Sequence, residues 1–370
     1  NISRQLYWGH RIPVYYIKQD KSKFVVARNN DEALKKFKLK FNISSISSSD
    51  FFQDDDVLDT WFSSWIWPIS VFDGVRNPDN EDISYYYPTS DIVTGPDILF
   101  FWIARMIMSG YYLKNQKPFK NVYFTGLVRD EKGRKMSKQL GNSPDPIELI
   151  ESYGADGVRI GLLFSAPAGN DLLFDKKLCI QGKNFSNKIW NAYRLINGFE
   201  VSSKKEQEIF EIAAIKWFKE EFNSKVIDID NAFDNFKISE ALMITYKLVW
   251  DDFCSTFLEI VKPKYGDKIS PKTELEINNL FIKILSILQP FMPFISSEIF
   301  EKISVSYDNL EWPKTHDIDI KTIKNFEHTN ELVSKIRNFK KSNNIGFKDS
   351  IKLYYDNHRC VKHQNSFMLR

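Results

Sequence analysis

The spacing of the hydrophobic residues changes once along the chain, and this change limits the folds that the sequence can form. Between residues 85 and 165, short strand, loop and helix patterns alternate, which is typical of a parallel α/β sheet. From about Phe174, apolar residues recur at three- and four-residue spacing over long stretches, as in a helical bundle. The sequence therefore predicts an α/β part followed by an all-α part, with the linker at residues 165–175.

Several segments of the α/β part have the spacing of one kind of secondary structure. Residues 14–17, VYYI, predict a strand, and the lysine-rich residues 31–41 predict a helix. Residues 87–112 are expected to begin as a strand and to continue as a helix, with Thr94 as its cap and Pro96 in the first helical position.

Longer helices are expected further along the chain. Residues 146–163 predict one helix, on which Asp156 and Arg159 are spaced to interact at i, i+3. In the all-α part, long helices are expected over residues 176–199, over residues 238–262, and from Glu274 to a kink at Pro290.

Charge is spread unevenly over a chain of ordinary composition. The 370 residues are 43% hydrophobic and 27% charged, and suffice for two or three domains. The net charge is +3, but residues 331–370 hold nine Lys or Arg and three Asp or Glu, a local charge of +6. Such a basic segment suits a polyanionic partner, although solvated tails often have the same composition.

Cysteine spacing and hydropathy exclude several classes of protein. Cys179, Cys254 and Cys360 are far apart and form no CxxC pair, so neither a disulfide framework nor a zinc knuckle is supported, and a reducing cytoplasm fits best. The longest apolar run, residues 98–108, contains Arg105 and is too short to cross a bilayer. No membrane contact is expected. Because the chain opens without Met inside a structured-looking segment, we expect a fragment.

Two lysines lie in a polar loop that follows an apolar run. In NVYFTGLVRDEKGRKMSKQLGNSPDP, residues 121–146, the apolar run 122–128 precedes a polar turn around Gly133, and Lys135 and Lys138 follow. Lysine ammonium groups act as point charges on phosphates, and nearby glycines let backbone donors approach. The segment predicts a phosphate-binding loop, although a solvated basic loop has a similar composition.

Each of several aromatic and acidic residues upstream of this loop could have either a structural or a binding role. Trp61 lies in a tryptophan-rich stretch that suits either a core or the wall of a small-molecule pocket. Ile98, Trp102 and Arg105 recur at i, i+4 and i+7 and so share one helix face, which is core or pocket. Asp97 either caps this helix or accepts hydrogen bonds from a ribose.

The run KMSKQLGNSPDP resembles the KMSKS signature loop of the class I aminoacyl-tRNA synthetases. Gln139 stands where that family usually has Ser, and it keeps a polar side chain. The resemblance implies that Lys135 and Lys138 stabilise the triphosphate of ATP while an amino acid attacks the α-phosphate.

Further segments are similar to the bacterial-type valyl members of that family: DVLDTWFSS, YPTSDIVTGPDILFFWIARM, GNDLLFD and FSNKIWNAYRLI. This resemblance implies activation of L-valine with ATP and Mg²⁺, and transfer to tRNA(Val) by a cytoplasmic monomer. The implied site residues are Trp61, Ile98 and Trp102 in the valine pocket, Gly95 and Asp97 at the ATP ribose, and Val128 at adenine.

The resemblance also implies how the chain is divided. Residues 1–50 would be the return from an editing insertion, 51–173 the second half of a Rossmann-type catalytic domain, 174–330 a helical anticodon-binding domain, and 331–370 a basic C-terminal segment. In the helical domain, Asn184, Asn187, Lys188 and Arg194 are the expected tRNA contacts, and no residues are assigned to a metal.

Some family features are missing from the sequence. The HIGH motif does not occur, WGHRIP at residues 8–13 being the nearest string, and the editing domain is absent. We therefore expect no catalysis by this chain alone. Two alternatives stay open: an isoleucyl member of the family, whose pocket helix resembles GSDQHRGWF, and a non-catalytic tRNA-binding module.

Overall fold

The chain folds into two compact units, residues 1–125 and 126–370, and each is described by itself. The structure, a computed structural model, describes residues 2–137, 139–165, 169–306, 310–346, 349 and 351. No helix among these residues has the length and apolar character that a membrane crossing requires. The two units divide the chain elsewhere than the four segments expected from the sequence, and those segments stay a prediction.

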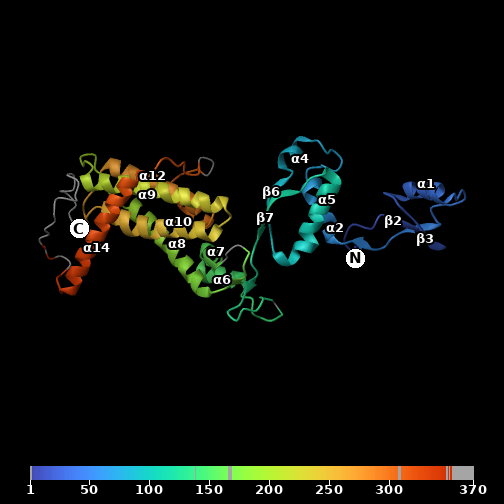
Figure 1. Cartoon of the computed structure of the whole chain (residues 1–370), viewed down its shortest axis with the longest axis horizontal. Coiled ribbons are helices and arrows are strands. Elements are labelled where there is room, and N and C mark those ends of the chain that lie inside the picture. Colours follow the sequence, from blue (N-terminus) through green and yellow to red (C-terminus); the bar gives the residue numbers. More distant parts are fainter. Residues whose placement is uncertain are drawn as a thin grey trace. The chain divides into compact units, whose positions relative to one another are not determined.

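The first unit combines short antiparallel sheets with a parallel strand pair (Figure 1). Its elements are β1 (Ser3–Arg4), β2 (Val14–Ile17), β3 (Asp20–Val26), α1 (Asn30–Phe41), β4 (Phe51–Gln53), β5 (Val57–Leu58), α2 (Thr60–Ser64), α3 (Trp67–Ser70), α4 (Glu81–Tyr86), β6 (Thr89–Thr94), the 3₁₀ helix η1 (Pro96–Ile98), the π-helix η2 (Leu99–Ile103), α5 (Ala104–Lys114) and β7 (Phe119–Phe124).

An antiparallel sheet covered by one helix opens this unit. β2 pairs with β3 on one side and with β4 on the other. α1 begins where the Asn29 side chain accepts a hydrogen bond from the amide of Glu32, and its fully buried Phe37 lies against Phe51 of β4. The predicted strand at 14–17 and the predicted helix at 31–41 are confirmed.

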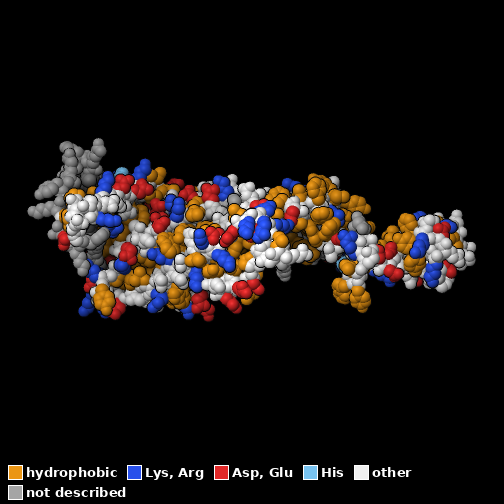
Figure 2. Space-filling model, turned by 90° about the horizontal axis from the view of Figure 1, so that it is seen from below, with side chains coloured by type: hydrophobic (Ala, Val, Ile, Leu, Met, Phe, Trp, Pro, Cys, Tyr) orange, Lys and Arg blue, Asp and Glu red, His pale blue; other side chains and the backbone are white. Residues whose placement is uncertain are grey.

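A strand–helix–strand crossover forms the rest of the unit. β6 and β7 pair in parallel from Thr89 opposite Phe119 to Thr94 opposite Phe124, with η1, η2 and α5 as the connection. Such parallel pairs are the building block of nucleotide-binding sheets. Figure 2 shows hydrophobic side chains gathered at the surface of the part that holds α4 and α5, where Phe100, Met108 and Tyr112 are exposed.

The predicted start of the crossover helix needs a correction. Pro96 does take the first position, but the N-cap is Gly95 and no side chain caps the helix. The Thr94 hydroxyl donates instead to the carbonyl of Gly95. The helix then passes through a 3₁₀ turn and a π turn before it becomes α-helical, so it has no ordinary first turn for Thr94 to cap.

The second unit begins with a parallel strand pair and continues as a helical bundle (Figure 1). Its elements are β8 (Val128–Arg129), α6 (Pro146–Tyr153), α7 (Ala155–Ser165), β9 (Leu172–Leu173), α8 (Lys176–Asn197), α9 (Ile209–Asp234), α10 (Ile238–Lys247), the π-helix η3 (Leu248–Phe257), α11 (Leu258–Val261), α12 (Pro271–Leu288), α13 (Pro293–Lys302) and α14 (Ile320–Ser342).

A large apolar core holds the bundle together. It joins residues of α7 to α14, and its fully buried aromatic side chains include Phe185, Phe218, Phe253 and Phe300. α9 was not predicted from the sequence, although it is 26 residues long and contributes to this core from Ala214 to Ala232. The α/β-then-helical fold class is confirmed.

The predicted helix over 146–163 is wrong in one respect. Gly154 adopts a left-handed φ of 77° and separates α6 from α7. Asp156 and Arg159 interact through their charges, but both form their hydrogen bonds with other residues. Asp156 accepts hydrogen bonds from the amides of Phe294 and Ile295, 3.3 and 2.7 Å away, and so caps α13, while Arg159 donates to the carbonyls of Pro290 and Phe291.

The long helices of the bundle follow the predictions with shifted ends. α8 matches the prediction for 176–199, and the helix over 238–262 is present as α10, η3 and α11, with a ten-residue π segment in its middle. The third begins at Pro271 rather than Glu274, capped by Ser270, and gives way to α13 rather than kinking at Pro290.

Candidate functional site

The lysine loop, residues 135–142, is preceded by a tight turn. The amide of Asp130 donates to the carbonyl of Arg134 at 2.9 Å, and the amide of Gly133 donates to the carbonyl of Asp130 at 2.8 Å. Gly133 has a φ of 75°, which residues with a side chain rarely adopt. The polar turn that the sequence predicted around Gly133 is confirmed.

The Asp130 carboxylate holds this turn from inside. It is only 9% exposed and accepts four hydrogen bonds: 3.0 Å from Asn142 Nδ2, 2.8 Å from each of the Arg134 amide and Nε, and 3.0 Å from the Lys132 amide. These hydrogen bonds hold the pKa of Asp130 well below its usual range, and the bond from Asn142 has the largest effect. The positive charge of Arg134 acts in the same direction. Asp130 is therefore a carboxylate at neutral pH.

Asn142 joins the two ends of the lysine loop. Its Oδ1 accepts the amide of Ser137 at 2.9 Å, and its Nδ2 donates to the carbonyl of Lys135 at 3.3 Å as well as to Asp130. Met136 packs against the buried cluster of Leu149, Leu172 and Phe174, whereas Lys135 is exposed. The loop thus buries its methionine and presents Lys135 to solvent. Lys138, the second predicted lysine, lies outside the described residues.

The strand before the loop is fixed by the segment around Asp171. Arg129 of β8 forms an ion pair with Asp171, whose carboxylate also accepts the amide of Leu127 at 3.2 Å. The hydrogen bond from the Arg129 side chain, followed by that from the Leu127 amide, lowers the pKa of Asp171. A side chain at Gly126 would put its Cβ 1.7 Å from the carbonyl oxygen of Asn170, so glycine is required there. The predicted adenine contact, Val128, has its carbonyl bonded to the Met136 amide.

The predicted valine pocket lies in the other unit and is built around Trp61. Asp59 caps α2 by accepting the backbone amide of Trp61 at 2.8 Å. The indole lies 4.7 Å from the Phe101 ring and 6.3 Å from the Trp102 ring, and the Arg105 guanidinium stands 4.4 Å above it. Trp61 and Trp102 are thus brought together as expected.

Two residues of this aromatic group were missed as site residues, and the π-helix explains why. Phe101 was not considered, and Arg105 was assigned only to a shared helix face. The face Ile98–Trp102–Arg105 assumed 3.6 residues per turn, but η2 follows the wider π spacing. Ile98 lies at the end of η1 with 38% of its surface exposed.

Gly95 and Asp97, the expected ribose contacts, are close neighbours at the end of β6. A Cβ at Gly95 would lie 2.7 Å from Oδ1 of Asp97, so the carboxylate folds back over the glycine backbone. Any larger residue at position 95 would displace the Asp97 carboxylate.

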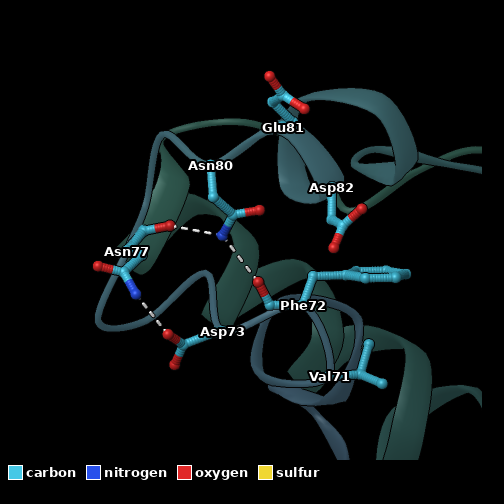
Figure 3. Close-up of a pocket in the computed structure, with 7 residues that line it drawn as sticks. All are labelled: Val71, Phe72, Asp73, Asn77, Asn80, Glu81 and Asp82. Atoms are coloured by element: carbon cyan, nitrogen blue, oxygen red, sulfur yellow. Dashed lines mark hydrogen bonds between the residues drawn. The ribbon is translucent and has the colours of Figure 1, made fainter.

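A surface hollow beside α4 does not belong to these groups (Figure 3). Asp73 accepts from Arg76 and Asn77 at 2.7 and 2.5 Å, and the Asn80 amide donates to the carbonyls of Phe72 and Asn77. These polar side chains are used to close the turn before α4. We assign the hollow a structural role.

The expected tRNA contacts lie along α8. Asn184, Asn187 and Arg194 are exposed, opposite the buried face of that helix. Lys188 is partly buried, and its ammonium stands 5.4 Å above the Trp250 ring, so it has a packing partner within the bundle.

Comparison with known families accounts for both units. Residues 1–175 match the family model of class I tRNA synthetases (I, L, M and V), and residues 216–355 match the anticodon-binding domain of tRNA ligase. The chain belongs to the class I tRNA synthetases. The resemblance drawn from the lysine loop is confirmed.

Several curated relatives of this chain have the same name. It is 51% identical over 356 residues to a valine--tRNA ligase of Christiangramia forsetii and 50% identical over 357 residues to that of Parabacteroides distasonis, with 95% of this chain aligned in each. This chain is also 48% identical to the valine--tRNA ligase of Porphyromonas gingivalis, with 99% of this chain aligned. The chain spans 41 to 42% of the length of these relatives.

Solved synthetases share the fold at low identity. A ternary complex of LeuRS, tRNA and LeuAMS from Agrobacterium radiobacter matches 87% of this chain and 42% of its own with a TM-score of 0.62 at 19% identity. Methionyl-tRNA synthetase of Mycobacterium tuberculosis in complex with methionyl-adenylate matches 69% of this chain and 52% of its own, with a TM-score of 0.52 at 19% identity. α8, which carries the expected tRNA contacts, lies between the two family matches.

Proposed function

We propose that this chain is part of an enzyme that activates L-valine with ATP to valyl-adenylate and transfers the valyl group to tRNA(Val). The observation that carries the proposal is 51% identity over 95% of the chain with a valine--tRNA ligase. The lysine loop, closed by Asn142 and anchored by Met136, adds a site of the right chemistry. Because the chain spans 41% of that relative, the activity belongs to a longer protein that contains this sequence.

In the proposed reaction, the chain positions ATP and stabilises charge on it. Lys135 and Lys138 lie against the phosphates, where fixed positive charges favour the transition state of adenylyl transfer. Gly95 and Asp97 hold the ribose, and the backbone at Val128 meets adenine. Mg²⁺ enters on the ATP phosphates, as it does in many phosphate-transfer sites. Among the described residues, no group of three or more His, Cys, Asp or Glu side chains is placed to hold a metal ion.

The proposed valine pocket is the aromatic group around Trp61. Trp61, Phe101 and Trp102 offer apolar ring surface for a branched aliphatic side chain. Ile98 would complete the pocket by closing around the substrate.

The tRNA partner is proposed from the helical unit. The match of residues 216–355 to an anticodon-binding domain supports it, and Asn184, Asn187, Lys188 and Arg194 of α8 are the proposed contacts. Monomeric state and a place in the cytoplasm stay predictions of the resemblance.

Amino-acid-dependent ATP–pyrophosphate exchange tests the proposal on a full-length protein that contains this sequence. We expect exchange with valine, and Lys138→Ala should lower its rate about a hundredfold with little change in the valine KM. Lys132→Ala, in the exposed turn before the loop, is the matched control and should leave the rate unchanged. Exchange with isoleucine in place of valine would indicate an isoleucyl enzyme, and tRNA binding without any exchange would indicate a non-catalytic module.

A further inference from the structure

The hydrogen bonds of Asp130 reach across the lysine loop to its far end. Two of its partners, Lys132 and Arg134, belong to the turn that precedes the loop, so these bonds are local. The bond from Asn142 spans twelve residues. A buried carboxylate in the turn therefore determines where the end of the loop lies.

Asn142 transmits this position to the residues that flank the loop lysines. With Nδ2 held by Asp130, its Oδ1 faces the other way and accepts the Ser137 amide, and the same Nδ2 reaches the carbonyl of Lys135. The amide of Leu140 adds a bond to the Ser137 hydroxyl at 3.2 Å. The backbone at Lys135 and Ser137 is thus tied to the carboxamide of Asn142, which is itself oriented by one buried charge.

We propose that Asp130 and Asn142 are positioning residues for adenylate formation, which together form a clip that sets the positions of residues 135–137 and of Asn142 before ATP binds. The inference rests on the proposed function, because it concerns the lysines of the same loop. Neither residue needs to touch the substrate. A loop held in one shape brings its lysines to the phosphates without further ordering, whereas a loop without the clip must be ordered during the reaction.

The clip predicts a particular kinetic pattern in the full-length protein. Asn142→Ala and Asn142→Asp should each lower kcat for valine-dependent exchange by about tenfold to a hundredfold, the scale of a misplaced catalytic group. The KM for valine should change less than twofold, because the loop does not contact the valine pocket in the proposal. Asn142→Asp should be the worse variant, since it places a second carboxylate 3.0 Å from Asp130.

Exchanging the donor and acceptor provides a rescue. In Asp130→Asn, the new carboxamide faces the carboxamide of Asn142 instead of accepting from it as a carboxylate does. The kcat of this single variant should therefore also fall. In the double variant Asp130→Asn with Asn142→Asp, a carboxamide again faces a carboxylate, and the carboxylate introduced at position 142 can still accept the Ser137 amide. The kcat of the double variant should exceed the product of the two single effects by at least about tenfold. Simple additivity would overturn the clip.

A control separates positioning from local stability. Asp145 accepts the Ile147 amide at 2.7 Å and caps α6 directly after the loop, without a role in the clip. Asp145→Ala should lower the melting temperature as much as the Asn142 variants do, yet leave kcat within twofold. If Asp145→Ala loses as much kcat as Asn142→Ala, the proposal fails, because loosening the region would then suffice.

Amide hydrogen exchange of the 370-residue chain tests the clip without activity. Asn142→Ala should speed exchange at the Ser137 amide, while Asp145→Ala should leave it unchanged. If the exchange rate of the Ser137 amide is the same in Asn142→Ala as in the wild type, the clip is refuted even if the enzyme is active. A wild-type protein that shows no valine-dependent exchange would refute the proposed function instead, and a protected Ser137 amide would then still support the clip.

Discussion

Among single residues, Asp252 has an environment far from that of a carboxyl group in water. It lies on η3, where burial comes first and the nearby negative charge of Glu221 comes second in raising its pKa to about 7. The positive charge of Lys225 lowers the pKa of Asp252, but Lys225 also forms an ion pair with Glu221, with 3.2 Å between its Nζ and the Glu221 carboxylate. A carboxyl group in this position is protonated more readily in the folded chain than in the unfolded one.

This asymmetry predicts how stability depends on pH. An unfolded Asp has a pKa of about 3.9, so between about pH 4 and pH 7 the folded state binds more protons, and the free energy of unfolding falls as pH rises. Asp252→Asn removes this contribution, so at pH 8 the variant should be more stable than the wild type by about 1–3 kcal/mol, with the difference vanishing near pH 4. Urea unfolding at both pH values measures it. A stability difference between wild type and Asp252→Asn that is the same at pH 4 and at pH 8 would refute the assignment.

Among the helices, α7 and α8 are in backbone contact, which the sequence marks with glycines. A Cβ at Gly182 of α8 would lie 2.5 Å from the carbonyl oxygen of Gly157 and 2.9 Å from its Cα. A Cβ at Gly161 of α7 would lie 2.8 Å from the backbone nitrogen of Cys179. Backbone atoms cannot rotate away as side chains do, so the two helices would have to separate.

Replacing Gly182 should therefore destabilise the bundle. Alanine is the better helix former by about 1 kcal/mol, but the clash with Gly157 should outweigh this and leave Gly182→Ala about 1–3 kcal/mol less stable in urea unfolding. Asn191→Ala, at an exposed position of the same helix, makes the same kind of replacement without a clash and should be neutral or slightly stabilising. A Gly182→Ala chain as stable as Asn191→Ala would mean that the helices have room to separate.

The sequence predicted helices with an uninterrupted apolar stripe and missed one whose stripe is interrupted. The buried residues of α9 recur at three- and four-residue spacing, but Glu211 and Asn223 among them are polar, and the exposed Ile209 and Ile212 add apolar residues outside the stripe. The break at Gly154 was missed because one glycine inside a helical pattern is usually tolerated.

The same limit applies to the candidate site. The turn at Gly133 is local, and the sequence indicated it. The group around Trp61 joins α2 to residues some 40 positions later, and a π turn decides which of them face it. Neither the long-range contact nor the π turn leaves a periodic signal, so Phe101 was not predicted.

At the scale of the whole molecule, charge is the property that bears on a large partner. The net charge of the chain is +3, and residues 331–370 alone sum to +6, so the remainder sums to −3. α14 contributes to this basic segment and carries Lys340 and Lys341 in its last turn. Association with an RNA through such a segment would release counterions and weaken with salt.

We expect the 370-residue chain to bind valine tRNA, with an affinity that falls as salt rises. Arg194 is exposed on α8, so Arg194→Gln should weaken binding and reduce the slope of log K against log salt by about one if it contacts a phosphate. Arg76→Gln removes the same charge from an exposed position in the first unit, where Arg76 pairs with Asp73, and should leave the slope unchanged. Titrations at several salt concentrations measure this slope.

The same titrations with a tRNA of changed anticodon measure whether the chain prefers the valine anticodon. Single-stranded anticodon bases are read by stacking and hydrogen bonds, so the tRNA with the changed anticodon should bind more weakly at every salt concentration. Equal affinity for the two tRNAs throughout would mean that the helical unit holds the RNA by charge alone and does not read its anticodon.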